Sequence, residues 1–218
     1  MKNLFYRYRH AWVLSYAFIY LPWFLYLEKK VTNHYHIMHV AIDDYIPFNE
    51  YFIIPYFLWF FYVSAAILYF FFAGVKDYYK LCTMLFTGMT ISLMVCTVFP
   101  NGTDFRPVIN PDKNVFSYIV SFLYSKDTCT NVFPSIHVYN SICVHIAVSH
   151  SEKLRQNRLI QAGSFLLMVS ICLATVFLKQ HSAFDGLGAL VMASIMYQFV
   201  YSGSYVRGRN EVSEKAIG

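Results

Sequence analysis

Charged residues are scarce in this chain of 218 residues: Asp, Glu, Lys and Arg make up 13%, against 57% hydrophobic and 20% aromatic residues. A water-soluble domain carries about 25% charged residues, so this composition excludes one. No internal repeat and no low-complexity segment is visible, and apolar runs recur along the whole length. The membrane is therefore the expected solvent for most of the chain.

Cysteine is also sparse, and its five positions form no CxxC pair. Four of them lie within apolar runs, which indicates small packing residues rather than a disulfide framework. The formal net charge of +5 comes from basic residues scattered between the apolar runs. We therefore expect no nucleic-acid partner and attribute the positive charge to orientation in the bilayer.

Six apolar segments are each about as long as the roughly 20 residues that a bilayer requires. They predict an all-α fold, an integral membrane bundle of six transmembrane helices in which residues 1–218 form a single membrane domain. The first segment lacks a small-residue cleavage site, so we interpret it as a span rather than a signal peptide. The fourth contains Asn140, Ser141 and His145 and is expected inside the bundle. The expected spans are approximately Ala11–Leu27, Phe52–Gly74, Leu81–Phe99, Ser135–Ser149, Leu159–Leu178 and Phe184–Tyr201.

The distribution of Lys and Arg predicts the orientation, because the side richer in these residues is normally cytoplasmic. Eleven of the 17 fall on the side of the two termini. The remaining six fall on the side of the loops around Arg106, Ser135 and His181. Both termini are therefore expected in the cytoplasm and these three loops on the extracytoplasmic face, and we expect the plasma membrane as the location.

Polar and apolar residues alternate at near-helical spacing between the first two expected spans, which predicts an interfacial helix. This segment contains His34, His36 and His39, a set that could bind a metal ion. Their spacings of two and three residues give them no fixed common face, so the sequence predicts no metal there.

The stretch Asn131-Val-Phe-Pro-Ser-Ile-His137 places a proline, a hydroxyl and an imidazole where a polar loop enters an apolar segment. Pro134 and Ser135 suit the first turn of a helix, whose free N–H groups attract anions. Further on, His181 and Asp185 lie four residues apart. On a helix they would share a face, and the carboxylate would fix the tautomer of the imidazole.

Arg106 and Lys179 add positive charge at the same membrane face, and Arg106 offers a planar fork of donors for phosphate oxygens. The set predicts phosphoryl transfer through a phosphohistidine, with His181 as nucleophile, Asp185 as its partner, and His137 as acid and base. Zinc held by the same three residues is the alternative, although nearby cations would repel a metal ion. The predicted phosphate-binding residues are Arg106, Ser135 and Lys179.

Three motifs within residues 101–190, Arg106-Pro107, Pro134-Ser-Ile-His137 and His181-x3-Asp185, resemble those of the type 2 phosphatidic acid phosphatases, the lipid phosphate phosphatase superfamily. The resemblance implies a helical bundle with an active site at the outer membrane face that dephosphorylates lipid phosphates without a metal or cofactor. The chain departs from the pattern at Phe99 and Thr175, where the family has Lys and Arg, and at Ile136, where it has Gly. Lys179 and Lys126 are the available substitutes.

Three functions are therefore open. The first is a membrane phosphatase for a lipid phosphate such as phosphatidic acid, phosphatidylglycerol phosphate or a polyprenyl diphosphate. The run from Thr175 to His181 is similar to the branch that includes inositol phosphorylceramide synthases, which suggests as the second a lipid phosphotransferase that passes the phosphoryl headgroup to an alcohol. The third is a non-catalytic membrane scaffold or lipid-binding protein. Lipid phosphate and membrane lipids are the expected partners, and the sequence leaves the oligomeric state open.

Overall fold

The computed structural model describes residues 8–31 and 34–202, and the chain is mostly helical, as predicted. The termini, with Lys2, Arg7, Arg207, Arg209 and Lys215 of the orientation argument, lie outside these residues. Two short strands, β1 (His36–Ile37) and β2 (Asn101–Gly102), pair in parallel. The helical elements are η1 (Arg9–Tyr16), α2 (Ala17–Lys30), α3 (Ile42–Tyr45), η2 (Glu50–Phe52), α4 (Ile53–Ala73), α5 (Val75–Val98), α6 (Val115–Lys126), α7 (Ile136–His150), α8 (Arg158–Phe177), α9 (Ala183–Tyr197) and η3 (Gln198–Ser202).

The described residues include five helical stretches long and apolar enough to cross a membrane, which suggests a membrane protein. They match five of the six expected spans. The sixth, Ser135–Ser149, corresponds to α7, whose 15 residues extend roughly 22 Å. That is short of the hydrocarbon core of a bilayer, about 30 Å, so the six-span count stays a prediction. The five stretches are Arg9–Lys30, Glu50–Ala73, Val75–Val98, Arg158–Phe177 and Ala183–Tyr201.

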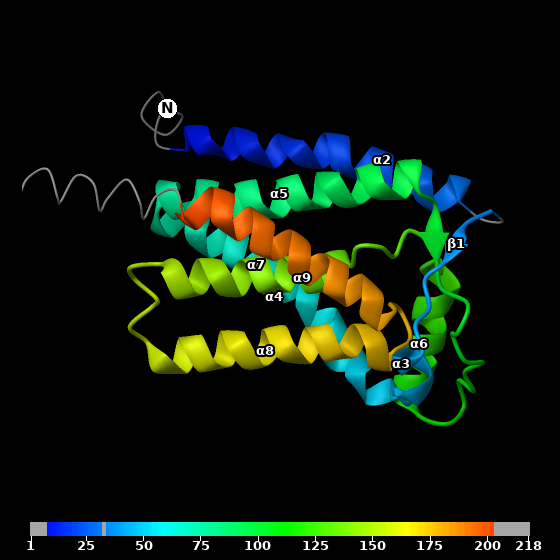
Figure 1. Cartoon of the computed structure of the whole chain (residues 1–218). Coiled ribbons are helices and arrows are strands. Elements are labelled where there is room, and N and C mark those ends of the chain that lie inside the picture. Colours follow the sequence, from blue (N-terminus) through cyan, green and yellow to red (C-terminus); the bar gives the residue numbers. More distant parts are fainter. Residues whose placement is uncertain (1–7, 32–33, 203–218) are drawn as a thin grey trace, which may run out of the picture.

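Helix α7 lies inside the bundle, where it packs against α4, α5, α8 and α9 (Figure 1). Its polar residues Asn140 and Ser141 are buried, as expected for an interior helix. The close approach to α5 requires a glycine, because a Cβ atom at Gly88 would lie 2.1 Å from the ring of Tyr139. The Tyr139 hydroxyl donates to the Met84 carbonyl at 2.7 Å, which fixes α7 against α5.

One end of the bundle carries α3, α6 and the two strands, while η1 begins and α9 ends at the opposite end (Figure 1). The segment predicted as an interfacial helix contains β1 and the four-residue helix α3, so that prediction is not confirmed. Helix α6 lies in a region that we expected to be loop. The Asn114 side chain caps it by accepting a hydrogen bond from the Ser117 N–H at 2.9 Å.

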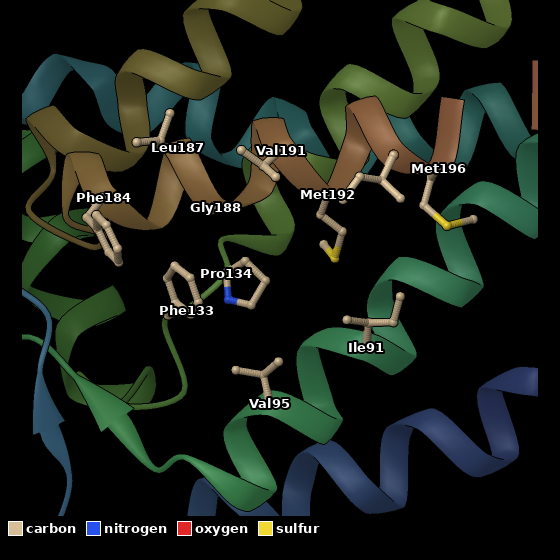
Figure 2. Close-up of a pocket in the computed structure, with 11 residues that line it drawn as sticks. Ile91, Val95, Phe133, Pro134, Phe184, Leu187, Gly188, Val191, Met192 and Met196 are labelled. Atoms are coloured by element: carbon tan, nitrogen blue, oxygen red, sulfur yellow. The ribbon is translucent and has the colours of Figure 1, made fainter. Parts of the chain in front are cut away.

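An apolar groove of about 440 Å³ runs between α5 and α9, and Phe133 and Pro134 line it (Figure 2). Gly188 lets the Phe133 ring pack beneath α9, because a Cβ atom there would lie 2.5 Å from that ring. The Ser92 hydroxyl of α5 donates to the Pro134 carbonyl at 3.1 Å. These contacts fix the loop that leads into α7 from its apolar side.

The same loop is held from its polar side by Asn101. The Asn101 side chain is buried, and its carbonyl oxygen accepts from the N–H groups of Val132 and Phe133 at 2.9 and 2.7 Å. Asn101 belongs to strand β2. The pairing of β1 with β2 therefore also positions the loop that leads into α7.

Candidate active site

Two histidines from distant parts of the chain meet at the end of the bundle that carries α3 and α6. His137 lies in the first turn of α7, and His181 lies in the loop between α8 and α9. The Nε2 atom of His181 is 3.4 Å from the Nδ1 atom of His137. Two imidazoles in contact can act on the same small group beside them.

Aromatic side chains of α4 hold the ring of His137 in place. The ring centroids of Tyr56 and Trp59 lie 4.7 and 4.4 Å from that of His137. Both aromatic side chains are buried. This packing restricts the rotation of the imidazole, so its nitrogens keep a fixed direction relative to His181.

Asp185 orients His181 from the first turn of α9. Its Oδ2 atom accepts from the Ser182 N–H at 2.9 Å and lies 3.3 Å from Nδ1 of His181. Ser182 is the N-cap of α9 and forms a capping box with Asp185. The Asp185 side chain is fully buried, and its Oδ1 atom has no hydrogen-bond partner in the part of the chain that the structure describes. The carboxylate therefore fixes the position of the imidazole through Oδ2.

Asp43 of α3 supports the same loop from outside the predicted motifs. Its carboxylate accepts from the Ser182 hydroxyl and from the Ala183 N–H at 2.5 and 2.8 Å. Its backbone carbonyl accepts from the Lys179 ammonium at 2.6 Å. Lys179 has a positive φ of 53°, and its ammonium lies 5.5 Å from the centroid of the Phe105 ring. Asp43 thus fixes both sides of His181.

Arg106 reaches the site from the loop after β2. Its terminal nitrogens donate to the backbone carbonyls of Asp127 and Thr128 at 2.7 and 2.8 Å and to the side-chain carbonyl of Gln180. The guanidinium also stacks on the Tyr124 ring, 4.9 Å from its centroid. Because Gln180 directly precedes His181 in the chain, its bond to Arg106 holds the guanidinium close to His181.

A cavity of about 60 Å³ unites these groups, room for roughly four to six water molecules. Of the residues predicted from the sequence, His137, His181 and Arg106 line it, and Asp185 contacts His181 from behind. Ser135 and Lys179 do not line it. Ser135 is fully buried as the N-cap of α7, where its hydroxyl accepts from the Val138 N–H, and Lys179 points to Asp43.

Three residues that line this cavity have a buried polar atom without a partner in the described part of the chain: the donors Nε of Arg106 and Nε2 of Gln180, and the acceptor Oδ1 of Asn131. Gln180 is buried, at 2% exposed, and lines the cavity. An unpaired buried donor costs roughly 1–3 kcal/mol, and a bound anion would remove that cost by accepting from it. Arg106 and Gln180 are therefore the residues that could donate to an oxyanion in this cavity.

Carboxylates face the same cavity. The Glu28 carboxylate, at the end of α2, accepts from the Thr128 hydroxyl at 2.6 Å and the Asn131 amide at 2.9 Å. Asp127 lies 3.3 Å from Arg106. Burial raises the pKa of the Asp127 carboxyl above its ordinary value, and the positive charge of Arg106 opposes that rise. The walls thus combine one guanidinium with two carboxylates.

A larger, mainly apolar cavity of about 680 Å³ adjoins the first between α2, α4 and α7. Glu28, Tyr56, Asp127 and His137 line both cavities. Its volume lies within the range of small-molecule sites, about 300–1,000 Å³. Apolar side chains, the greater part of them from α2 and α4, form most of its wall, a suitable environment for a lipid chain.

Among the described residues, no group of three or more His, Cys, Asp and Glu side chains is placed to hold a metal ion. The sequence reasoning missed four polar residues that build the site: Glu28, Asp43, Asp127 and Gln180. Gln180 stood between two residues already singled out. The other three belong to segments with no motif, and no local pattern marks them.

Fold and site together define a helical protein with candidate membrane spans and a buried His–His–Asp cluster at one end. No model of a known protein family, no curated protein and no solved structure matches the chain. The resemblance to the phosphatidic acid phosphatase superfamily therefore rests on the three motifs alone.

Proposed function

We propose that this chain is an integral membrane enzyme that hydrolyses a lipid phosphate through a phosphohistidine on His181, a member of the lipid phosphate phosphatase superfamily. The observation that carries the proposal is the contact between His181 and two partners at once, Asp185 at 3.3 Å and His137 at 3.4 Å, beside unpaired donors of a small cavity.

In the first step, Nε2 of His181 attacks phosphorus and forms a P–N bond while the P–O bond to the leaving group breaks. His137 donates a proton to the leaving oxygen. Asp185 accepts the Nδ1–H of His181 and stabilises the positive charge that develops on the imidazole. In the second step, water loses a proton to His137 and attacks phosphorus, and the P–N bond breaks.

The phosphoryl oxygens would accept from Arg106 Nε and Gln180 Nε2, the two donors left unpaired. Gln180 takes the place that the sequence argument gave to Lys179. The lipid chain would occupy the apolar cavity between α2 and α4, whose wall contains Leu21, Leu25 and Phe57. In the proposed mechanism, both steps use only the side chains named above and one water molecule.

The test is release of phosphate from lipid phosphates by the purified protein in mixed micelles, with and without EDTA. We expect release that persists in EDTA, is inhibited by vanadate and is lost in His181→Ala. Release abolished by EDTA would favour the zinc alternative. Binding of lipid phosphate without any release, unchanged in His181→Ala, would favour a non-catalytic lipid-binding protein.

A second candidate function is transfer of the phosphoryl headgroup to an alcohol. One observation favours it: a further pocket adjoins the cavity on the far side of Arg106 and has room for an alcohol acceptor. Incubation of labelled lipid with and without added alcohols separates the phosphatase from the transferase, because a transferase forms a new phosphodiester.

The proposed location is the plasma membrane with both termini cytoplasmic and the site extracytoplasmic, because eleven of the 17 Lys and Arg residues fall on the side of the termini.

A further inference from the structure

The buried ring of Trp59 carries a hydrogen-bond donor that the fold leaves unpaired. Trp59 lies on α4 and is 9% exposed, and its Nε1 atom has no hydrogen-bond partner among residues 8–31 and 34–202. An indole N–H can only donate, whereas a hydroxyl can rotate and also accept. A buried Trp N–H usually finds an acceptor, and one without a partner is unfavourable. A bound ligand could supply the missing acceptor at Trp59.

Trp59 lines the apolar cavity between α2 and α4 but not the small cavity at the two histidines. Tyr56, three residues earlier on α4, lines both cavities. Since a helix rises about 1.5 Å per residue, Trp59 lies roughly 4.5 Å further along α4, away from the end of the bundle that carries α3 and α6. Its ring also packs on that of His137, with the centroids 4.4 Å apart. The unpaired donor therefore lies just beneath the place where a phosphoryl group would be held.

This position determines which part of a lipid phosphate would meet the indole N–H. The phosphoryl oxygens belong to the small cavity, which Trp59 does not line. A hydrocarbon chain has no acceptor. The missing acceptor is therefore a neutral oxygen that lies a few bonds from phosphorus on the lipid side. In acyl lipids an ester or amide carbonyl occupies that place, whereas a polyprenyl diphosphate has only hydrocarbon there.

We propose that Trp59 is a specificity-determining residue whose Nε1–H donates to the acyl carbonyl next to the lipid phosphate. The inference rests on the proposed function and narrows its substrate class to lipids with such a carbonyl. The hydrogen bond takes no part in bond breaking, and His181 and His137 keep the roles given above. It fixes how deep the lipid lies in the apolar cavity, so that phosphorus is held at His181.

The test compares two lipids that differ in the carbonyl alone. Diacyl phosphatidic acid and its dialkyl ether analogue have the same chain length, the same phosphate and the same charge. Each is presented to the full-length protein in mixed micelles, and phosphate release is compared as kcat/KM. We expect the diacyl lipid to be hydrolysed roughly three- to tenfold faster, the factor of one hydrogen bond. This comparison uses the wild-type protein and does not depend on the folding of a variant.

Trp59→Phe removes the N–H and keeps an aromatic ring against His137. Altered packing against His137 lowers the rate for both lipids alike, so the ratio of the two rates reports the N–H itself. We expect that ratio to fall to about one. Trp23→Phe is the matched control, because Nε1 of Trp23 on α2 donates to the Thr97 hydroxyl at 3.0 Å and Trp23 lines neither of the two cavities. That variant should keep the wild-type ratio.

Equal wild-type rates for the two lipids, or a preference that Trp59→Phe leaves unchanged, would overturn the role of Trp59. Faster release from a polyprenyl diphosphate than from diacyl phosphatidic acid would overturn it as well. If the release observed in these cases is lost in His181→Ala, the proposed function stands without this inference. If no lipid gives release that depends on His181, both fail.

Discussion

Replacement of Asp185 by Asn removes one charge from the site and little else. The Asn carbonyl oxygen can take the place of Oδ2 and still accept from the Ser182 N–H at 2.9 Å and from His181 at 3.3 Å. The amide nitrogen then replaces Oδ1, which has no partner among the described residues. The cap of α9 and the tautomer of His181 are kept, so the variant should fold.

The expected loss in kcat follows from the separation of the charges. A unit positive charge on His181, 3.3 Å from a carboxylate oxygen, is stabilised by about 5 kcal/mol at an effective dielectric constant of about 20. Loss of that interaction in the transition state slows the reaction by roughly three to four orders of magnitude, since each 1.36 kcal/mol is about tenfold. The assay is initial-rate product release from lipid phosphate, with Tm measured in parallel.

Asp44→Asn is the matched control, because Asp44 also pairs with a histidine, His39, at 2.9 Å but is exposed. We expect that variant to keep the wild-type rate. If Asp185→Asn retains more than about a tenth of the activity with an unchanged Tm, the carboxylate does not stabilise a charged His181 in the reaction, and the proposed step at His181 is wrong.

Three further predictions concern the supports of the site. Asp43→Ala loses the bonds to Ser182 and Ala183, so we expect kcat to fall and Tm to drop by roughly 6–12 °C, the equivalent of about 3 kcal/mol, while Asp44→Ala leaves both unchanged. Gly88→Ala places a methyl group against the Tyr139 ring and should lower the free energy of unfolding by about 1–3 kcal/mol, measured by thermal or denaturant unfolding. Gly163→Ala in α8 is the control, because its methyl group meets open space and should not destabilise the protein. Equal stabilities of the two variants would contradict the packing of α5 on α7. Arg106→Lys cannot replace the planar fork that reaches Asp127, Thr128 and Gln180, so we expect kcat/KM to fall about 10–100-fold, and wild-type kcat/KM would exclude a positioning role for the fork.

Much of the fold could be predicted because membrane spans leave a strong local signal. Five of the six expected spans correspond to long apolar helices. Helix α6 was not predicted, because its 12 residues are too few for a span and the segment was treated as a loop. The interfacial helix was predicted from spacing alone, but His36 and Ile37 pair with β2 instead, a long-range contact that no local pattern reveals.

The site was predicted in part for a related reason. His137 and His181 follow motifs at the ends of apolar segments, and the end of the bundle where they meet follows from the orientation of the spans. The direction of a side chain within a loop does not follow from the orientation of the spans. The positive φ at Lys179 turns the chain so that its ammonium reaches Asp43, while the next residue, Gln180, lines the cavity. Glu28 comes from α2, about 100 residues before its partner Thr128.

The most direct test of the central claim is to trap the covalent intermediate. The protein is mixed briefly with lipid labelled at phosphorus, denatured in alkali, and digested for mass spectrometry. The account predicts an alkali-stable, acid-labile phosphoramidate on His181 that is absent from His181→Ala. Product release with no adduct on His181, or an adduct on another residue, would contradict it.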